Sequence, residues 1–255
     1  VFILASTLAL LLPSYAQHSS LHEIGIVLLH GKGGKPGSLA GLANKLQSEG
    51  MKVVIPTMAW SGHSGEPDEY GLTYENALQD IEGSIQNLRS RGLSKIVLAG
   101  HSLGANAAIA FGTNPNLYAI IALAPGHFPE RMHGPDIQNK LDEARMKIAA
   151  GQGKSQSIFP DLNSGSHFQV RGNYLAWYSY FNPNGLANMS KTVTHIKAPL
   201  LLINGKDDPA GAQSKSSIFD RAPANGKNRY IEIDAGHFDV PEKAANFIIT
   251  WLSSL

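Results

Sequence analysis

The fold of this chain is decided by the stretch Lys95-Ile96-Val97-Leu98-Ala99-Gly100-His101-Ser102-Leu103-Gly104. Its first half is a continuous apolar run rich in branched side chains, which predicts a strand covered on both faces. Its second half matches the pattern G-x-S-x-G, in which a serine stands on a sharp turn between a strand and a helix. Both glycines are needed because larger side chains there would collide with neighbouring backbone. Ser102 is therefore the first candidate functional residue.

The five-residue pattern does not decide the matter alone. Composition by itself would produce it in a glycine-rich chain of this length with a probability of about 0.2. Its context gives it weight, because apolar strand candidates of the same kind lie on both sides of it. These are Ile24–Leu29, Val53–Ile55, Tyr118–Leu123, Pro199–Ile203 and Tyr230–Ile233.

Segments with helical spacing of apolar residues lie between these strand candidates. One helix is predicted from Tyr74 to Leu88, with Gly92 after it as a natural stop, and another from about Pro241 to Leu252. Alternation of strands and helices implies an α/β fold with a mostly parallel central sheet flanked by helices.

A long insertion, at about residues 126–191, interrupts this alternation because it holds no convincing central strand. It contains an amphipathic helix around Ile137–Ile148 and an aromatic cluster between Tyr174 and Phe181. Long insertions between strands are usually lids or binding elements. The aromatic side chains fit either an apolar substrate pocket or packing of the insertion onto the sheet.

Two strand candidates near the C-terminus each end in a loop with polar residues, Asn204-Gly205-Lys206-Asp207-Asp208-Pro209 and Asp234-Ala235-Gly236-His237-Phe238. Pro209 keeps Asp208 out of the helical region and favours a projecting backbone. Asp207 fits a solvated turn or a helix cap instead. His237 is one of 10 histidines, but it completes the chain order nucleophile, acid, base, each after its own strand.

The first strand candidate ends in a glycine-rich turn, His30-Gly31-Lys32-Gly33-Gly34. A dinucleotide loop of the G-x-G-x-x-G type fails at Pro36, and a P-loop fails because neither glycine–lysine pair of this turn is followed by Ser or Thr. The turn fits a loop whose backbone N–H stabilises an oxyanion, with a plain flexible turn as the alternative. The predicted oxyanion donors are the backbone N–H groups of Lys32 and Leu103.

These four motifs, in this order, resemble the α/β-hydrolase family over roughly residues 24–252. In that family the acid commonly lies three residues after a glycine such as Gly205, which selects Asp208. The insertion occupies the family's usual cap position, before the strand that bears the acid. The turn reads His-Gly-Lys-Gly-Gly instead of three consecutive glycines, so the first oxyanion donor stays open.

The chemistry predicted from these roles is acyl transfer by Ser102, Asp208 and His237 through an acyl-enzyme. Cleavage of a carboxylic ester is the leading prediction. The alternatives are an amidase or peptidase, a thioesterase, an acyltransferase, or a non-catalytic binding protein on the same scaffold. Neither a metal nor an organic cofactor is expected.

The composition indicates which class of binding partner to expect. The 255 residues include no cysteine and balance 21 basic against 20 acidic side chains. A dedicated nucleic-acid binder has a basic surplus that is missing here, so a small-molecule ester or acyl substrate is the expected partner. Without cysteine there is no thiol nucleophile to compete with Ser102.

The first residues predict a partial secretory signal. The apolar stretch Val1–Leu12 is followed by Pro13 and by Ser14-Tyr15-Ala16, a small-residue cleavage site that ends at Ala16. A buried N-terminal strand or helix is the alternative, and a membrane anchor is disfavoured because a span needs about 20 apolar residues. We expect an exported protein, periplasmic or secreted, with one domain over residues 17–255.

Overall fold

Six apolar strands form one parallel sheet in the order β2-β1-β3-β4-β7-β8. The computed structural model describes residues 21–61, 70–163 and 165–255, so the predicted signal segment, residues 1–16, lies outside the described residues. The strands are β1 (Ile24–Leu29), β2 (Lys52–Val54), β3 (Lys95–Ser102), β4 (Ala119–Pro125), β7 (Leu200–Gly205) and β8 (Arg229–Ile233). The predicted α/β fold with a parallel sheet is confirmed.

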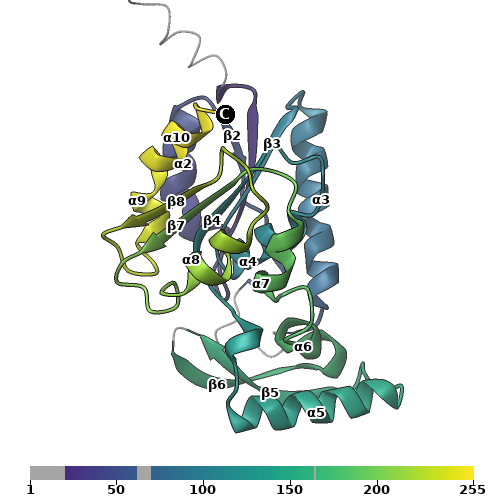
Figure 1. The fold of residues 1–255 in the computed structure, drawn as a ribbon. Coiled ribbons are helices and arrows are strands. Elements are labelled where there is room, and N and C mark those ends of the chain that lie inside the picture. The colour runs from purple at the N-terminus through teal and green to yellow at the C-terminus, as the bar shows by residue number, and fades with distance from the viewer. Residues whose placement is uncertain (1–20, 62–69, 164) are drawn as a thin grey trace, which may run out of the picture.

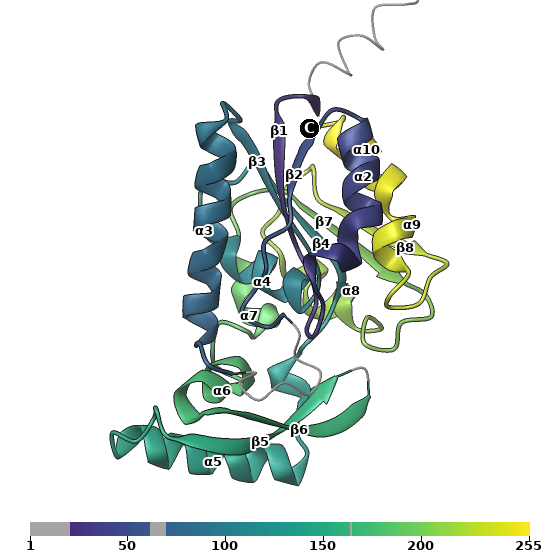
Figure 2. The same ribbon diagram turned by 180° about the vertical axis from the view of Figure 1, so that it is seen from behind.

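Helices cover both faces of this sheet, as Figures 1 and 2 show. One face is covered by α3 (Tyr74–Ser90) and α4 (Leu103–Phe111). The other is covered by α2 (Ala40–Ser48), α9 (Val240–Lys243) and α10 (Ala245–Leu252). Alternate residues of each central strand therefore enter two different cores, which explains why the strand sequences are apolar throughout.

Three helices are predicted from their apolar spacing; one lies in the insertion, and the other two pack on the sheet with ends that follow from local sequence. The hydroxyl of Thr73 accepts a hydrogen bond from Asn76 N at 3.2 Å and caps α3, while Gly92 with φ +85° lets the chain leave it. The predicted C-terminal helix is divided into α9 and α10 at Ala244, whose backbone angles stay helical. No helix in the described part of the chain has the length and apolar character needed to cross a membrane.

The insertion lies at the end of the sheet where β3 and β4 finish (Figures 1 and 2). Its elements are α5 (Pro135–Ala149), the antiparallel hairpin of β5 (Gln156–Asn163) and β6 (Ser166–Asn173), and α6 (Tyr174–Phe181). The hairpin was not predicted, because its strands are largely polar and partly exposed. Shorter segments are η1 (Pro36–Leu39), η2 (Pro129–Arg131), α7 (Met189–Thr192), η3 (Val193–His195), α8 (Ser214–Ser217) and η4 (Phe219–Arg221).

The aromatic cluster packs inside the insertion. Trp177 stacks between Phe159 and Phe181, with ring centroids 5.1 and 4.5 Å apart, and all three side chains are fully buried. Such stacked rings stabilise the contact of α6 with the hairpin. The sequence left two interpretations of this cluster, a substrate pocket or packing of the insertion. These three rings fit the second.

Candidate functional site

Ser102 occupies the turn between β3 and α4 in a strained conformation. Its φ is 56° and its ψ is −118°, a region that residues with a side chain seldom adopt. A Cβ atom on Gly100 would lie 2.1 Å from Gly104 O, and one on Gly104 would lie 2.3 Å from Leu29 O. The turn therefore tolerates only glycine on both sides of the serine, which is the steric requirement expected from the motif.

Asp208 and His237 come together from the loops that follow β7 and β8. His237 Nδ1 donates to Asp208 Oδ2 at 2.7 Å, and the Asp208 side chain is 1% exposed. Burial alone would raise the pKa of Asp208, but the hydrogen bond and charge of His237 outweigh it and the pKa is lowered. An ionised Asp208 fixes the imidazole with Nδ1 protonated, which leaves Nε2 as the basic atom. Asp207, the neighbouring candidate, is exposed in the turn.

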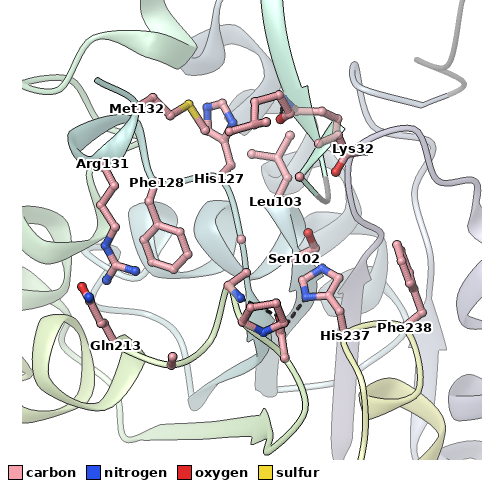
Figure 3. A pocket seen from close by; sticks show the side chains of 18 of the residues that line it. Lys32, Ser102, Leu103, His127, Phe128, Arg131, Met132, Gln213, His237 and Phe238 are labelled. Atoms are coloured by element: carbon pink, nitrogen blue, oxygen red, sulfur yellow. Dashed lines mark hydrogen bonds and ion pairs between the residues drawn. The ribbon is translucent and has the colours of Figure 1, made fainter. Parts of the chain in front are cut away.

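Ser102 and His237 line the same cavity, whose volume is about 650 Å³. Figure 3 shows the Ser102 side chain beside the His237 ring, with Lys32 and Leu103 above them. The described residues include no direct hydrogen bond between Ser102 Oγ and His237, and such bonds often tighten only when substrate is bound. The three side chains predicted from separate loops are thus gathered at one edge of the sheet.

The turn after β1 lies against Ser102, since a Cβ atom on Gly31 would be 3.0 Å from Ser102 Cβ. The N–H groups of Gly33 and Gly34 donate to Trp60 O and Gly31 O at 3.1 and 3.0 Å. Within the described ranges, the backbone N–H groups of Lys32 and Leu103 have no acceptor. Both residues line the cavity with Ser102.

The side chain of Lys32 connects this turn to the insertion. Lys32 Nζ lies 2.6 Å from Asp161 Oδ1 in β5, and the two side chains are 4% and 2% exposed. Tyr70 Oη donates to the other carboxylate oxygen of Asp161 at 2.9 Å. Sequence reasoning missed Asp161 and Tyr70, because nothing in a single sequence pairs residues so far apart.

His101, the residue before the serine, was also missed as a functional candidate. Its Nε2–H donates to the backbone O of His237 at 2.9 Å, and the two rings lie 4.9 Å apart. Burial, with a smaller effect from the charge of His237, lowers the pKa of His101 to about 4. A neutral His101 therefore holds the loop that carries His237. Its position inside the G-x-S-x-G pattern was the only available signal.

Comparison with known proteins adds a family. The sequence matches the alpha/beta hydrolase family over residues 26–247, and a search of curated proteins gives no match. Similar solved structures include the alpha/beta hydrolase GrgF from Penicillium sp. sh18, 15% identical with a TM-score of 0.69 over 90% of this chain and 89% of that one. A monoacylglycerol lipase from Paleococcus ferrophilus is 23% identical, with a TM-score of 0.66 over 90% and 94%. A thermophilic esterase from Thermogutta terrifontis is 18% identical, with a TM-score of 0.61 over 91% and 90%. At these sequence identities, the structural similarity supports the fold alone.

Proposed function

Since the chain belongs to the alpha/beta hydrolase family, we propose that it is a serine hydrolase that cleaves a carboxylic ester. One observation carries the proposal. Ser102, on its strained turn, shares a cavity with His237, whose Nδ1 lies 2.7 Å from the buried carboxylate of Asp208. A nucleophile, a base and an orienting acid in this relation are the parts of a triad.

The first half of the reaction forms an acyl-enzyme. His237 Nε2 takes the proton of Ser102 Oγ as the oxygen attacks the ester carbonyl carbon. Asp208 stays ionised, holds the imidazole in the required tautomer and stabilises the imidazolium that forms. His237 then gives the proton to the leaving alkoxide, which departs as an alcohol.

The carbonyl oxygen becomes an oxyanion during the attack. The backbone N–H of Leu103 and the backbone N–H of Lys32 would donate to it, and the positive end of α4 favours the same charge. In the second half, His237 deprotonates a water molecule that attacks the acyl carbon. Breakdown of that intermediate releases a carboxylic acid and returns the proton to Ser102.

The cavity supports an ester substrate of moderate size. Its walls include the apolar side chains of Phe128, Met132 and Leu162, which suit an acyl chain. Two of the similar folds described above are named a lipase and an esterase, which is consistent with this proposal. Amides and thioesters are tested as rival substrates in the same experiment.

The test is a hydrolysis series with p-nitrophenyl esters of increasing chain length, together with matched anilide and thioester substrates. We expect the esters to be cleaved fastest by the wild type and Ser102→Ala to lose nearly all turnover, because a triad nucleophile contributes on the order of 10⁶-fold. Full ester turnover in Ser102→Ala would show that Ser102 is not the nucleophile. If the anilide or the thioester is cleaved faster than the ester, the proposed substrate class changes to an amide or a thioester.

A further inference from the structure

A second polar group faces the cavity on the side opposite the triad. We propose that Arg131, assisted by Gln213, binds a carboxylate carried by the substrate, so that the preferred ester has a carboxylate remote from its scissile bond. This inference rests on the proposed function of Ser102. Arg131 is the last residue of η2, the first helical segment after β4, and it lines the same cavity as Ser102 and His237.

The positions of these side chains suit a substrate that spans the cavity. Figure 3 shows Arg131 and Gln213 on one side, Ser102 and His237 on the other, and the ring of Phe128 between them. All five residues line the cavity. An ester carbonyl at Ser102 therefore leaves an apolar chain along Phe128 and a polar end near Arg131.

The guanidinium of Arg131 is held in place by its neighbours. Its Cζ lies 3.9 Å from the centre of the Phe128 ring, and its Nη2 donates to Ser217 Oγ at 2.5 Å. The Ser217 hydroxyl donates in turn to the backbone O of Gln213 at 2.7 Å. Arginine has five N–H donors, so a fixed orientation with one of them used leaves a preorganised fork for a ligand.

The guanidinium of Arg131 forms no ion pair within the described residues, although the carboxylate of Glu130 is near enough to act on it electrostatically. The Arg131 side chain is half-buried. Burial lowers the pKa of Arg131, with an opposing effect from Glu130, but arginine remains protonated at neutral pH. A half-buried cation is costly unless it is paired, and an anionic substrate group would supply the pair.

The other charged groups that line the cavity are engaged or face outward. Lys32 is paired with Asp161, and Asp208 with His237. Asp207 also lines the cavity, but its side chain is exposed, and its charge would repel an anion beside it. One guanidinium next to one amide matches the single charge and planar shape of a carboxylate. A phosphate dianion would need a further cation, and Lys32 is already occupied.

The kinetic test compares p-nitrophenyl half-esters of succinic, glutaric and adipic acid with p-nitrophenyl butyrate, valerate and hexanoate. Each pair differs only by a terminal carboxylate or methyl group. Loss of a charge-assisted hydrogen-bonded pair should lower the half-ester to neutral-ester ratio of kcat/KM in Arg131→Gln by about 10- to 100-fold. Arg131→Lys, which keeps the charge and loses the planar fork, should fall between the two.

Two matched variants separate binding from general effects. Arg91→Gln removes a positive charge from the exposed end of α3 and should leave the ratio unchanged. Ser217→Ala removes the hydrogen-bond partner of Arg131 without changing charge, and it should lower the ratio less than Arg131→Gln does. If Arg131 only anchors η2 to α8, Arg131→Gln and Ser217→Ala will slow both substrate classes equally, and the proposal is wrong.

A binding measurement makes the outcome independent of turnover. Calorimetry on Ser102→Ala should show monomethyl adipate binding more tightly than methyl hexanoate, and added Arg131→Gln should remove the difference. Selective, Arg131-dependent binding without any ester cleavage would uphold the carboxylate subsite and reject the proposed esterase. Ester cleavage with no carboxylate preference in either measurement would reject the subsite and leave the esterase standing.

Discussion

The strained turn at Ser102 is possible because glycine stands two residues before it and two residues after it. Each of these glycines lies so close to adjoining backbone that a methyl group would overlap a carbonyl oxygen, at 2.1 Å for Gly100 and 2.3 Å for Gly104. The close approach allows α4 to begin directly above β1 and β3, and it holds the serine at the cavity. Strain of this kind persists only where the surrounding packing determines the conformation.

The substitution Gly104→Ala tests this requirement. Because its Cβ would meet Leu29 O at 2.3 Å, we expect the free energy of unfolding to fall by about 3 kcal/mol or more. Gly83→Ala is the matched control, since α3 has open space there, and it should raise stability by about 0.5–1 kcal/mol. Urea unfolding of both variants measures the difference, and equal effects would contradict the steric account.

At the scale of elements, the insertion is joined to the sheet through Lys32. The buried pair of Lys32 and Asp161 connects the turn after β1 with β5, and Tyr70 adds a hydrogen bond to the same carboxylate. The Lys32 ammonium also lies 5.3 Å from the centre of the Phe181 ring in α6. The backbone N–H proposed as an oxyanion donor thus belongs to a residue whose side chain is fixed by the insertion.

Removing one partner of the Lys32–Asp161 ion pair should destabilise the folded protein. Asp161→Asn or Lys32→Met alone leaves a buried charge without a partner, and we expect a loss of about 3 to 5 kcal/mol in unfolding free energy. The double variant should lose less than the sum of the two, which a double-mutant cycle measures. Strictly additive losses would show that the two groups do not interact. Esterase kcat should fall in the single variants if the pair positions the Lys32 N–H.

The elements that could be predicted share one property: their sequence pattern can be recognised within a short stretch of the chain. The four inner strands, β1, β3, β4 and β7, are largely apolar because both sheet faces are covered. Ser102 lies at the end of β3, and Asp208 and His237 lie in the loops after β7 and β8. The β5–β6 hairpin escaped prediction because it is mostly polar. Asp161 and Arg131 could not be predicted because their partners are distant in sequence: Asp161 pairs with Lys32, and Arg131 donates to Ser217.

At the scale of the whole molecule, three histidines near the site come from three segments; His30 and His101 are buried, and His127 is half-buried at the cavity wall. His30 lies in the turn after β1, His101 before the nucleophile, and His127 at the start of the insertion. Burial lowers the pKa of each, to about 4 for His101 and about 3 for His127. All three are neutral in the folded protein at neutral pH.

These histidines predict a loss of stability in acid. Below the ordinary pKa of 6.5 the unfolded chain binds protons that the folded chain does not, so the unfolding free energy falls until pH reaches about 4 for His101. The slope is about 1.4 kcal/mol per pH unit for each of these histidines. His127→Asn, which tolerates the positive φ of 60° there, should reduce this slope. Exposed His133→Asn is the control, and equal slopes in the two variants would rule out burial as the cause.

The central claim is that Ser102 is a nucleophile activated by His237 and Asp208. The most direct measurement is reaction of the folded protein with a fluorophosphonate, followed by mass spectrometry of the peptides. We predict one adduct, on Ser102, that forms at least about a hundredfold more slowly in His237→Ala. No adduct on Ser102 in the folded protein, or equally fast labelling without His237, would contradict the account.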